Sequence, residues 1–145
     1  MKINTNDFQD NLVEKFSKIC DKKISLCPMM PGVAKTLKAL RDYRINMHIS
    51  SATPEKSLLH ILKKRNIHHY FSKMLGAPSS KISHIAGIKK FYKAEVSDIL
   101  YVGDSLIDKV SAEKSGVKFI SFKTNFKKTK VINDMTEILD LVNDE

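Results

Sequence analysis

Two aspartates four residues apart are the side chains of this sequence best suited to chemistry. Asp104 follows a short apolar run that ends at a glycine, and Asp108 comes four residues later. Residues 99–102 predict a buried parallel strand, and Gly103 permits a tight exit from it. Asp104 then lies at the carboxyl end of that strand, where open α/β sheets bind ligands. Two carboxylates at one corner favour Mg²⁺, although Asp108 also suits a helix N-terminus by its charge alone.

The elements that must position these carboxylates alternate along the chain. Short apolar runs predict strands at residues 45–50, near 73–75, at 99–102 and at 117–122. Helical spacing of apolar residues predicts helices at residues 6–20, 33–40, 53–66, around 82–88, from 104 to 115, and at 135–142. This alternation predicts an α/β fold, a parallel sheet covered by helices on both faces.

Length and composition favour one domain. The chain has 145 residues, 42% of them hydrophobic, which is enough for one core, and no apolar run is long enough to cross a membrane. Residues 1–7 lack a signal-peptide core, so we expect a cytoplasmic location. Cys20 and Cys27 are too few for a disulfide framework, and we interpret both as reduced thiols that pack like ordinary residues.

The net charge of +9 raises the possibility of an anionic partner. Residues 123–130 form the densest basic run and include one phenylalanine, a pattern that nucleic-acid-binding loops share. However, the lysines are spread along the whole chain, which favours a solvated loop over a nucleic-acid site.

Three segments in this order resemble the haloacid dehalogenase (HAD) superfamily of phosphohydrolases, particularly its phosphoglycolate phosphatase-like members. They are Met-His-Ile-Ser-Ser-Ala-Thr-Pro at residues 47–54, Gly-Ala-Pro-Ser-Ser-Lys at 76–81, and Gly-Asp-Ser-Leu-Ile-Asp at 103–108. The resemblance covers roughly residues 31–122. It implies a HAD-like, Rossmann-like core domain over residues 31–145, preceded by a remnant of a helical cap over residues 1–30.

The resemblance also implies roles for individual residues. Substrate binding falls to Ser51, Ala52 and Lys81, catalysis to Lys81 and Asp108, and a Mg²⁺ site to Asp104 and Asp108. The hydroxyl of Ser51, with Ser50 as the alternative, aligns with a group that hydrogen-bonds the phosphoryl group. Lys81 aligns with the lysine that balances the phosphate charge, and Asp108 orients either a metal-bound water or Lys81. Taken alone, Ser51 is better explained as a helix-entry residue, and Lys81 as a surface lysine.

The residue that starts the reaction in this family has no counterpart here. The family uses an Asp-x-Asp pattern after its first strand, in which the first aspartate attacks phosphorus, and this sequence contains no such pattern. Asp7 and Asp10 have the wrong spacing and lie in a helical pattern. The resemblance therefore implies that the chain begins inside the cap. We expect a domain of the Mg²⁺-dependent phosphomonoester hydrolase type that binds a small phosphorylated molecule. Because its nucleophile is absent, we expect this domain to be inactive alone. The alternative is a non-catalytic HAD-like binding or regulatory module completed by a partner chain.

The missing first strand also has an energetic consequence. In this family it lies at the centre of the sheet, between the strands that end at Ser51 and Asp104. Losing about five paired residues forfeits roughly 1 kcal/mol per hydrogen bond and roughly 1.5–3 kcal/mol per buried apolar side chain. That sum approaches a normal domain's stability of about 5–15 kcal/mol. The chain must therefore rearrange, borrow a strand from another chain, or be a fragment. We expect either direct pairing between residues 45–50 and 99–102, or a strand from another chain inserted between them, whereas an empty gap between them would contradict this stability argument and indicate a fragment.

Overall fold

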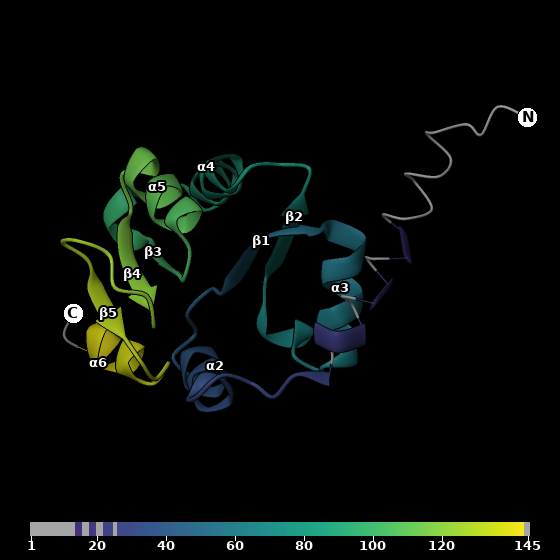
Figure 1. Ribbon diagram of the computed structural model, residues 1–145. Coiled ribbons are helices and arrows are strands. Elements are labelled where there is room, and N and C mark those ends of the chain that lie inside the picture. Colours follow the sequence, from purple (N-terminus) through teal and green to yellow (C-terminus); the bar gives the residue numbers. More distant parts are fainter. Residues whose placement is uncertain (1–13, 16–17, 20–21, 25, 144–145) are drawn as a thin grey trace, which may run out of the picture.

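The computed structural model describes residues 14–15, 18–19, 22–24 and 26–143, which form two small parallel sheets with helices around them (Figure 1). The strands are β1 (His48–Pro54), β2 (Lys73–Ala77), β3 (Leu100–Gly103), β4 (Lys118–Phe122) and β5 (Lys130–Ile132). The α-helices are α2 (Val33–Asp42), α3 (Glu55–Lys64), α4 (Lys81–Tyr92), α5 (Leu106–Ser115) and α6 (Glu137–Asn143). Two 3₁₀ turns, η1 (His68–Tyr70) and η2 (Val96–Asp98), precede β2 and β3.

This element order confirms the α/β alternation expected from the sequence, with local differences. β1 runs from His48 to Pro54 rather than over residues 45–50, so the helix expected from residue 53 begins only at Glu55, and β5 was not expected at all. Three residues are too few for a strand pattern to stand out, and β5 forms because β4 offers it a free edge. Most of the helix expected at residues 6–20 lies outside the described residues, although residues 14–15 and 18–19 are helical.

The two sheets do not join. In the first sheet β1 pairs in parallel with β2, and in the second the order is β3, β4, β5, also parallel. Direct pairing of residues 45–50 with 99–102, the first of the two expected alternatives, is therefore wrong, because among the described residues β1 pairs only with β2 and β3 only with β4. Helices hold the two sheets in place instead, since α4 packs against α5 and α2 packs against α6 (Figure 1).

The core lies mainly on the side of the second sheet. One buried cluster consists of Ile120, Phe122, Ile132 and Ile138, and a second of Ile85, Ala112 and Val117. The central strand β4 is buried at three consecutive positions, Ile120, Ser121 and Phe122. The second cluster ties α4 and α5 to this sheet, which fixes the first turns of both helices relative to β3.

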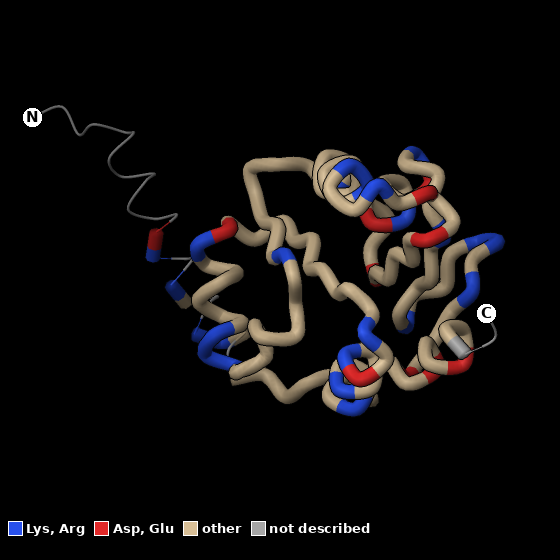
Figure 2. Tube along the Cα trace, turned by 180° about the vertical axis from the view of Figure 1, so that it is seen from behind, with Lys and Arg blue, Asp and Glu red and all other residues tan. Residues whose placement is uncertain are grey.

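The surface is basic over several elements. Lysine and arginine lie on α2, α3 and α4 and near β5 on the face that Figure 2 shows, rather than gathering at one place. In the basic run, Lys127 and Lys128 are exposed, and the ring of Phe126 lies against Phe119 with a centroid distance of 6.4 Å.

Cys27 carries a free thiol, but it is exposed, so the expectation that it packs like an ordinary core residue is wrong. It lies before α2 in the sequence. Cys20 lies outside the described residues. Among the helices that the structure describes, none is long and apolar enough to cross a membrane.

Candidate functional site

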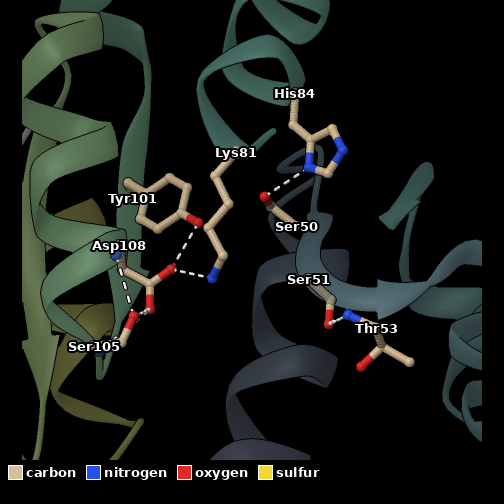
Figure 3. A network of polar contacts seen from close by, with 8 residues as sticks. All are labelled: Ser50, Ser51, Thr53, Lys81, His84, Tyr101, Ser105 and Asp108. Atoms are coloured by element: carbon tan, nitrogen blue, oxygen red, sulfur yellow. Dashed lines mark hydrogen bonds and ion pairs between the residues drawn. The ribbon is translucent and has the colours of Figure 1, made fainter. Parts of the chain in front are cut away.

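An ion pair between two helix N-termini forms the centre of the candidate site. Lys81 is the first residue of α4, which begins there because Ser80 caps the helix by accepting a hydrogen bond from the backbone N–H of Ser83 at 3.1 Å. Asp108 lies in the first turn of α5. The Lys81 Nζ donates to the Asp108 Oδ1, so the ion pair joins the two helices (Figure 3).

The start of α5 fixes Asp108 through a reciprocal cap. The Ser105 hydroxyl accepts from the Asp108 backbone N–H at 3.1 Å, and the Asp108 Oδ2 accepts from the Ser105 backbone N–H at 3.2 Å. The Ser105 hydroxyl also lies 2.5 Å from Oδ2. Asp108 therefore stabilises the N-terminus of α5, as its charge alone suggested in the sequence, and it forms the ion pair with Lys81 as well.

Asp108 remains a carboxylate despite its burial. Its side chain is 6% exposed, and Oδ1 accepts a second hydrogen bond, from the Tyr101 hydroxyl at 2.9 Å. Burial raises the pKa of Asp108, but the hydrogen bonds from Lys81, Ser105 and Tyr101 outweigh burial and hold the pKa below its ordinary value. Both carboxylate oxygens are therefore occupied by protein donors.

Gly103 makes room for this carboxylate. A Cβ placed at residue 103 comes within 2.5 Å of the Asp108 Cβ and 2.6 Å of its Cγ. Any larger residue at the end of β3 pushes the first turn of α5 outward. The glycine is needed here because α5 folds back closely over the strand end.

A second polar cluster links β1 to α4. The Ser50 hydroxyl lies 2.9 Å from the His84 Nδ1, and the His84 Nε2 lies 3.2 Å from the carbonyl oxygen of Gly76. A carbonyl oxygen only accepts, so Nε2 carries the proton, and in a neutral ring Nδ1 accepts from Ser50. Burial raises the pKa of Tyr101 to about 12, and the nearby Ser50 hydroxyl opposes that rise. Ser50 thus faces both α4 and β3.

Among the described residues, no hydrogen bond or ion pair joins the other expected site residues, Ser51, Ala52 and Asp104, to this ion pair. Ser51 is half-buried on β1, and its hydroxyl accepts from the Thr53 backbone N–H at 3.1 Å. Ala52 is exposed. In Figure 3 the Lys81 ammonium lies between Asp108 and the β1 segment that carries Ser51.

Asp104 lies just past the end of β3 and is exposed. Its carbonyl oxygen accepts from the Thr124 hydroxyl at 2.8 Å, which anchors the backbone of this turn. Its carboxylate makes no hydrogen bond or ion pair with the residues that the structure describes. Asp104 is therefore the carboxylate at this edge that is free to bind a ligand.

Three residues of the network were not found from the sequence: Tyr101, His84 and Ser105. Ser105 was detectable, because Ser-x-x-Asp at the start of a helical pattern is typical of a reciprocal cap. Tyr101 was hidden inside an apolar run that predicts a strand, and His84 gave no signal because its partner Ser50 is 34 residues away.

The site offers one free carboxylate for a Mg²⁺ ion. Mg²⁺ binds proteins through one or two carboxylates and completes its shell with water and substrate phosphate. Asp104 can supply one direct carboxylate oxygen, whereas the oxygens of Asp108 already accept from protein donors. Within the described part of the chain, no three His, Cys, Asp or Glu side chains gather as a metal-binding group. The site therefore suits a metal ion held mainly by water and phosphate.

Comparison with known proteins identifies the family. Residues 1–122 match the haloacid dehalogenase-like hydrolase family. The chain belongs to this family. The HAD-like, phosphoglycolate phosphatase-like resemblance expected from its three motifs is thereby confirmed.

The curated relatives of this HAD-like chain include phosphoglycolate phosphatases. It is 26% identical over 136 residues to a phosphoglycolate phosphatase of Pseudomonas fluorescens strain Pf-5, covering 90% of this chain and 50% of that protein. It is 30% identical over 99 residues to phosphoglycolate phosphatase 1 of Pseudomonas aeruginosa, covering 65% of this chain and 36% of that protein. The chain thus spans about half the length of the first of these relatives, and less of the second.

Solved structures share the fold. A HAD-superfamily hydrolase of subfamily IA from Geobacter sulfurreducens matches with a TM-score of 0.80 at 22% identity, covering 97% of this chain and 75% of that one. A predicted phosphoglycolate phosphatase from Haemophilus somnus matches with a TM-score of 0.73 at 24% identity, covering 79% and 57% of the two chains. These likenesses confirm the HAD-like, Rossmann-like architecture.

Proposed function

We propose that this HAD-like chain binds the phosphoryl group of a small phosphomonoester together with Mg²⁺, and that it does not hydrolyse the ester by itself. The observation that carries the proposal is the Lys81 ammonium at the first turn of α4, which the buried Asp108 holds and whose side chain is only 17% exposed. An ammonium group that is held in place and partly shielded from water can donate a strong hydrogen bond to a phosphate oxygen. The phosphoglycolate phosphatases among the relatives support a small phosphomonoester as the ligand.

Each residue of the site has a role in this proposal. Ser51 donates its hydroxyl to a phosphoryl oxygen, and the adjacent Ala52 offers its backbone N–H to the same group. Lys81 balances the phosphate charge. Asp108 is a positioning residue, because its carboxylate is fully engaged in holding Lys81 and the start of α5.

Asp104 is the residue that we propose as the direct ligand of Mg²⁺. When bound, the metal ion neutralises charge on the phosphoryl oxygens. The exposed carboxylate of Asp104 is available for this role, and its backbone is anchored through Thr124. Asp108 remains within the protein network.

The proposal that the chain is inactive alone rests on its sequence. No Asp-x-Asp pattern is present, and Asp104, the free carboxylate among the proposed site residues, is assigned to the metal ion rather than to attack on phosphorus. Removing a nucleophile costs on the order of 10⁶ in rate, equivalent to about 8 kcal/mol. We expect the bound ester to remain intact.

A second candidate is a non-catalytic binding or regulatory module that a partner chain completes. The separation of the described strands into two sheets favours it, because β1 and β3 each have a free edge. Phosphatase activity that appears only when a partner is added favours the enzyme. Complex formation that does not depend on phosphate favours the module.

Calorimetric titration of inorganic phosphate tests the proposal. We expect binding that requires Mg²⁺ and that weakens about tenfold or more in Ser51→Ala and in Asp104→Asn, since each loses a charged interaction worth about 1.5–3 kcal/mol. The matched control is Ser79→Ala, a hydroxyl deletion at an exposed position two residues before Lys81. Phosphate affinity that is equal in all four proteins, or unchanged without Mg²⁺, contradicts the proposal.

A further inference from the structure

A small pocket, which we call the arginine pocket, is lined by residues 41, 44–47 and 69–72. It lies where α2 ends and just before β1 and β2 begin, whereas the candidate site lies past the carboxyl ends of β2 and β3. The arginine pocket adjoins the larger pocket between β1 and β3, but Arg41, His69 and Tyr70 border the arginine pocket alone. Its volume is about 300 Å³, at the lower end of the range for small-molecule sites. The Ser72 backbone N–H donates to the Met47 carbonyl oxygen at 2.8 Å, which joins its two walls.

The arginine pocket holds two of the three arginines in the sequence. The chain has 22 lysines but arginine only at positions 41, 44 and 65. Arg65 has a structural task, because its Nη1 donates to the carbonyl oxygens of Ile24 and Cys27, both at 2.7 Å. A positive charge at the end of α2 suits lysine and arginine equally, but only arginine offers a planar fork of donors. In a chain that otherwise uses lysine, this pair of arginines indicates that the pocket needs the fork.

The charges of the two guanidinium groups are poorly neutralised. The Arg41 Nε lies 3.9 Å from the Asp42 Oδ1, a long contact between two side chains that are each about half exposed. Arg44 makes no ion pair with the residues that the structure describes. Among those residues, none that lines the arginine pocket is acidic. The pocket therefore carries net positive charge and suits an anion.

The ring of Tyr70 holds two polar groups in place. The Arg41 Cζ lies 5.0 Å from the centroid of this ring, and the centroid of the His69 ring lies 4.3 Å from it. A guanidinium group and an imidazole are thus kept at the same wall. The Ser72 hydroxyl donates to the Asn46 Oδ1 at 3.4 Å, which leaves the Asn46 amide nitrogen as a further donor. The pocket is therefore rich in donors.

Arg44 occupies a backbone position that favours glycine. Its φ is 61°, in the left-handed region, and the Ile45 N–H beyond it donates to the Leu40 carbonyl oxygen at 2.9 Å to close α2. Glycine is the usual residue at this point because a side chain is costly there. Arginine therefore lowers stability at this position, and its side chain is what it contributes. Lys93 ends α4 in the same conformation without lining the pocket, so it is a matched control.

We propose that the arginine pocket binds a small organic dicarboxylate whose two carboxylates pair with Arg41 and Arg44. A carboxylate is planar and accepts two parallel hydrogen bonds from one guanidinium group. Ile45, Met47 and Phe71 offer apolar surface to the hydrocarbon chain that joins the two carboxylates. A single phosphate group presents no such chain. The inference goes beyond the proposed phosphate binding, and it requires neither phosphate nor Mg²⁺.

Titration of the 145-residue chain with succinate, followed by the NMR shifts of its backbone amides, tests the proposal without phosphate or metal. We expect saturable shifts at residues 44–47 and 69–72, none at Lys81 or Asp104, and a dissociation constant of about 1 mM or tighter. The neutral isostere succinamide should bind at least about tenfold more weakly, because it lacks both charges. Shifts that are absent or centred on Lys81 overturn the proposal. Inorganic phosphate that displaces succinate at equal concentration overturns the choice of a dicarboxylate.

Three variants separate recognition by the fork from charge and from fold. Arg44→Lys keeps the charge and should weaken succinate binding at least about fivefold; unchanged affinity means that charge alone acts and rejects the proposal. Arg44→Gly and Lys93→Gly should both raise the urea midpoint, because glycine suits the left-handed backbone, but only Arg44→Gly should lose binding. Equal affinities in these two variants contradict the location. A lower urea midpoint in Arg44→Gly shows that the fold needs this arginine and overturns the argument.

Discussion

Replacement of Asp108 by asparagine tests the ion pair on which the candidate site depends. The substitution removes the negative charge that the Lys81 ammonium faces and leaves this lysine, whose side chain is only 17% exposed, without its counter-ion. Breaking a fully buried pair costs about 3–5 kcal/mol, and a hydrogen bond to a charged group contributes about 1.5–3 kcal/mol. Because water still reaches Lys81, we expect Asp108→Asn to lower the free energy of unfolding by about 1.5–3 kcal/mol.

Urea unfolding at pH 7 measures this loss, and two further variants define its origin. Asp104→Asn makes the same chemical change at an exposed carboxylate and is expected to cost less than about 0.5 kcal/mol. Lys81→Met leaves Asp108 buried without its cation, so the double variant Asp108→Asn/Lys81→Met should cost less than the sum of the single variants by about 1–2 kcal/mol. Equal losses in Asp108→Asn and Asp104→Asn, or strict additivity in the double variant, refute the reasoning.

The pH dependence has a definite sign. The pKa of Asp108 in the folded chain lies below its ordinary value, so the folded chain favours the carboxylate. Its contribution to stability is fully present above the ordinary pKa of about 4 and is lost as the pH falls through the folded value. The stability difference between the unmodified chain and Asp108→Asn should therefore narrow below about pH 4.

Three other predictions follow from local geometry, each read from urea unfolding. Gly103→Ala should lower the free energy of unfolding by about 1–3 kcal/mol, because the added Cβ collides with Asp108. Gly87→Ala in α4 meets nothing within 4 Å and should be neutral or stabilising. Equal effects of the two substitutions contradict this contrast. Burial lowers the pKa of His48, and the charge of Lys73 lowers it further, so the folded chain favours the neutral ring. The contribution of His48 to stability is therefore present above about pH 6.5 and should be lost at lower pH, and this loss should be absent in His48→Gln. Parallel pH profiles of the two proteins argue against this. Replacing Lys127, Lys128 or Lys130 of the basic run by serine should change the free energy of unfolding by less than about 0.5 kcal/mol in each case. A larger loss means that the run packs against the domain.

The alternation of helices and strands was predictable because it depends on local patterns. The helix starts at Lys81 and at Leu106 follow from serine caps in the sequence, and Gly116 ends α5 in the left-handed conformation that glycine favours. β5 could not be predicted, because it owes its existence to an edge that only the folded β4 provides.

The candidate site was only partly predictable for a related reason. Lys81 and Asp108 carry helix-start signals in the sequence, and α4 and α5 bring them together through apolar packing far along the chain. The occupation of both Asp108 oxygens by protein donors depends on Tyr101, which the strand pattern hides. Pairing of β1 with β3 was one of two outcomes expected from the family's strand order and from backbone energetics. It does not occur among the described strands, which belong to two separate sheets with a pocket between β1 and β3.

Mg²⁺-dependent hydrolysis of p-nitrophenyl phosphate by the purified chain tests the central claim most directly. The account predicts turnover no faster than the background without protein, because Ser51, Lys81 and Asp104 can hold a phosphoryl group but lack a nucleophile beside it. Mg²⁺-dependent turnover that disappears in Asp104→Asn contradicts the account. Activity that survives this substitution identifies a contaminant and calls for repetition with a separately purified sample.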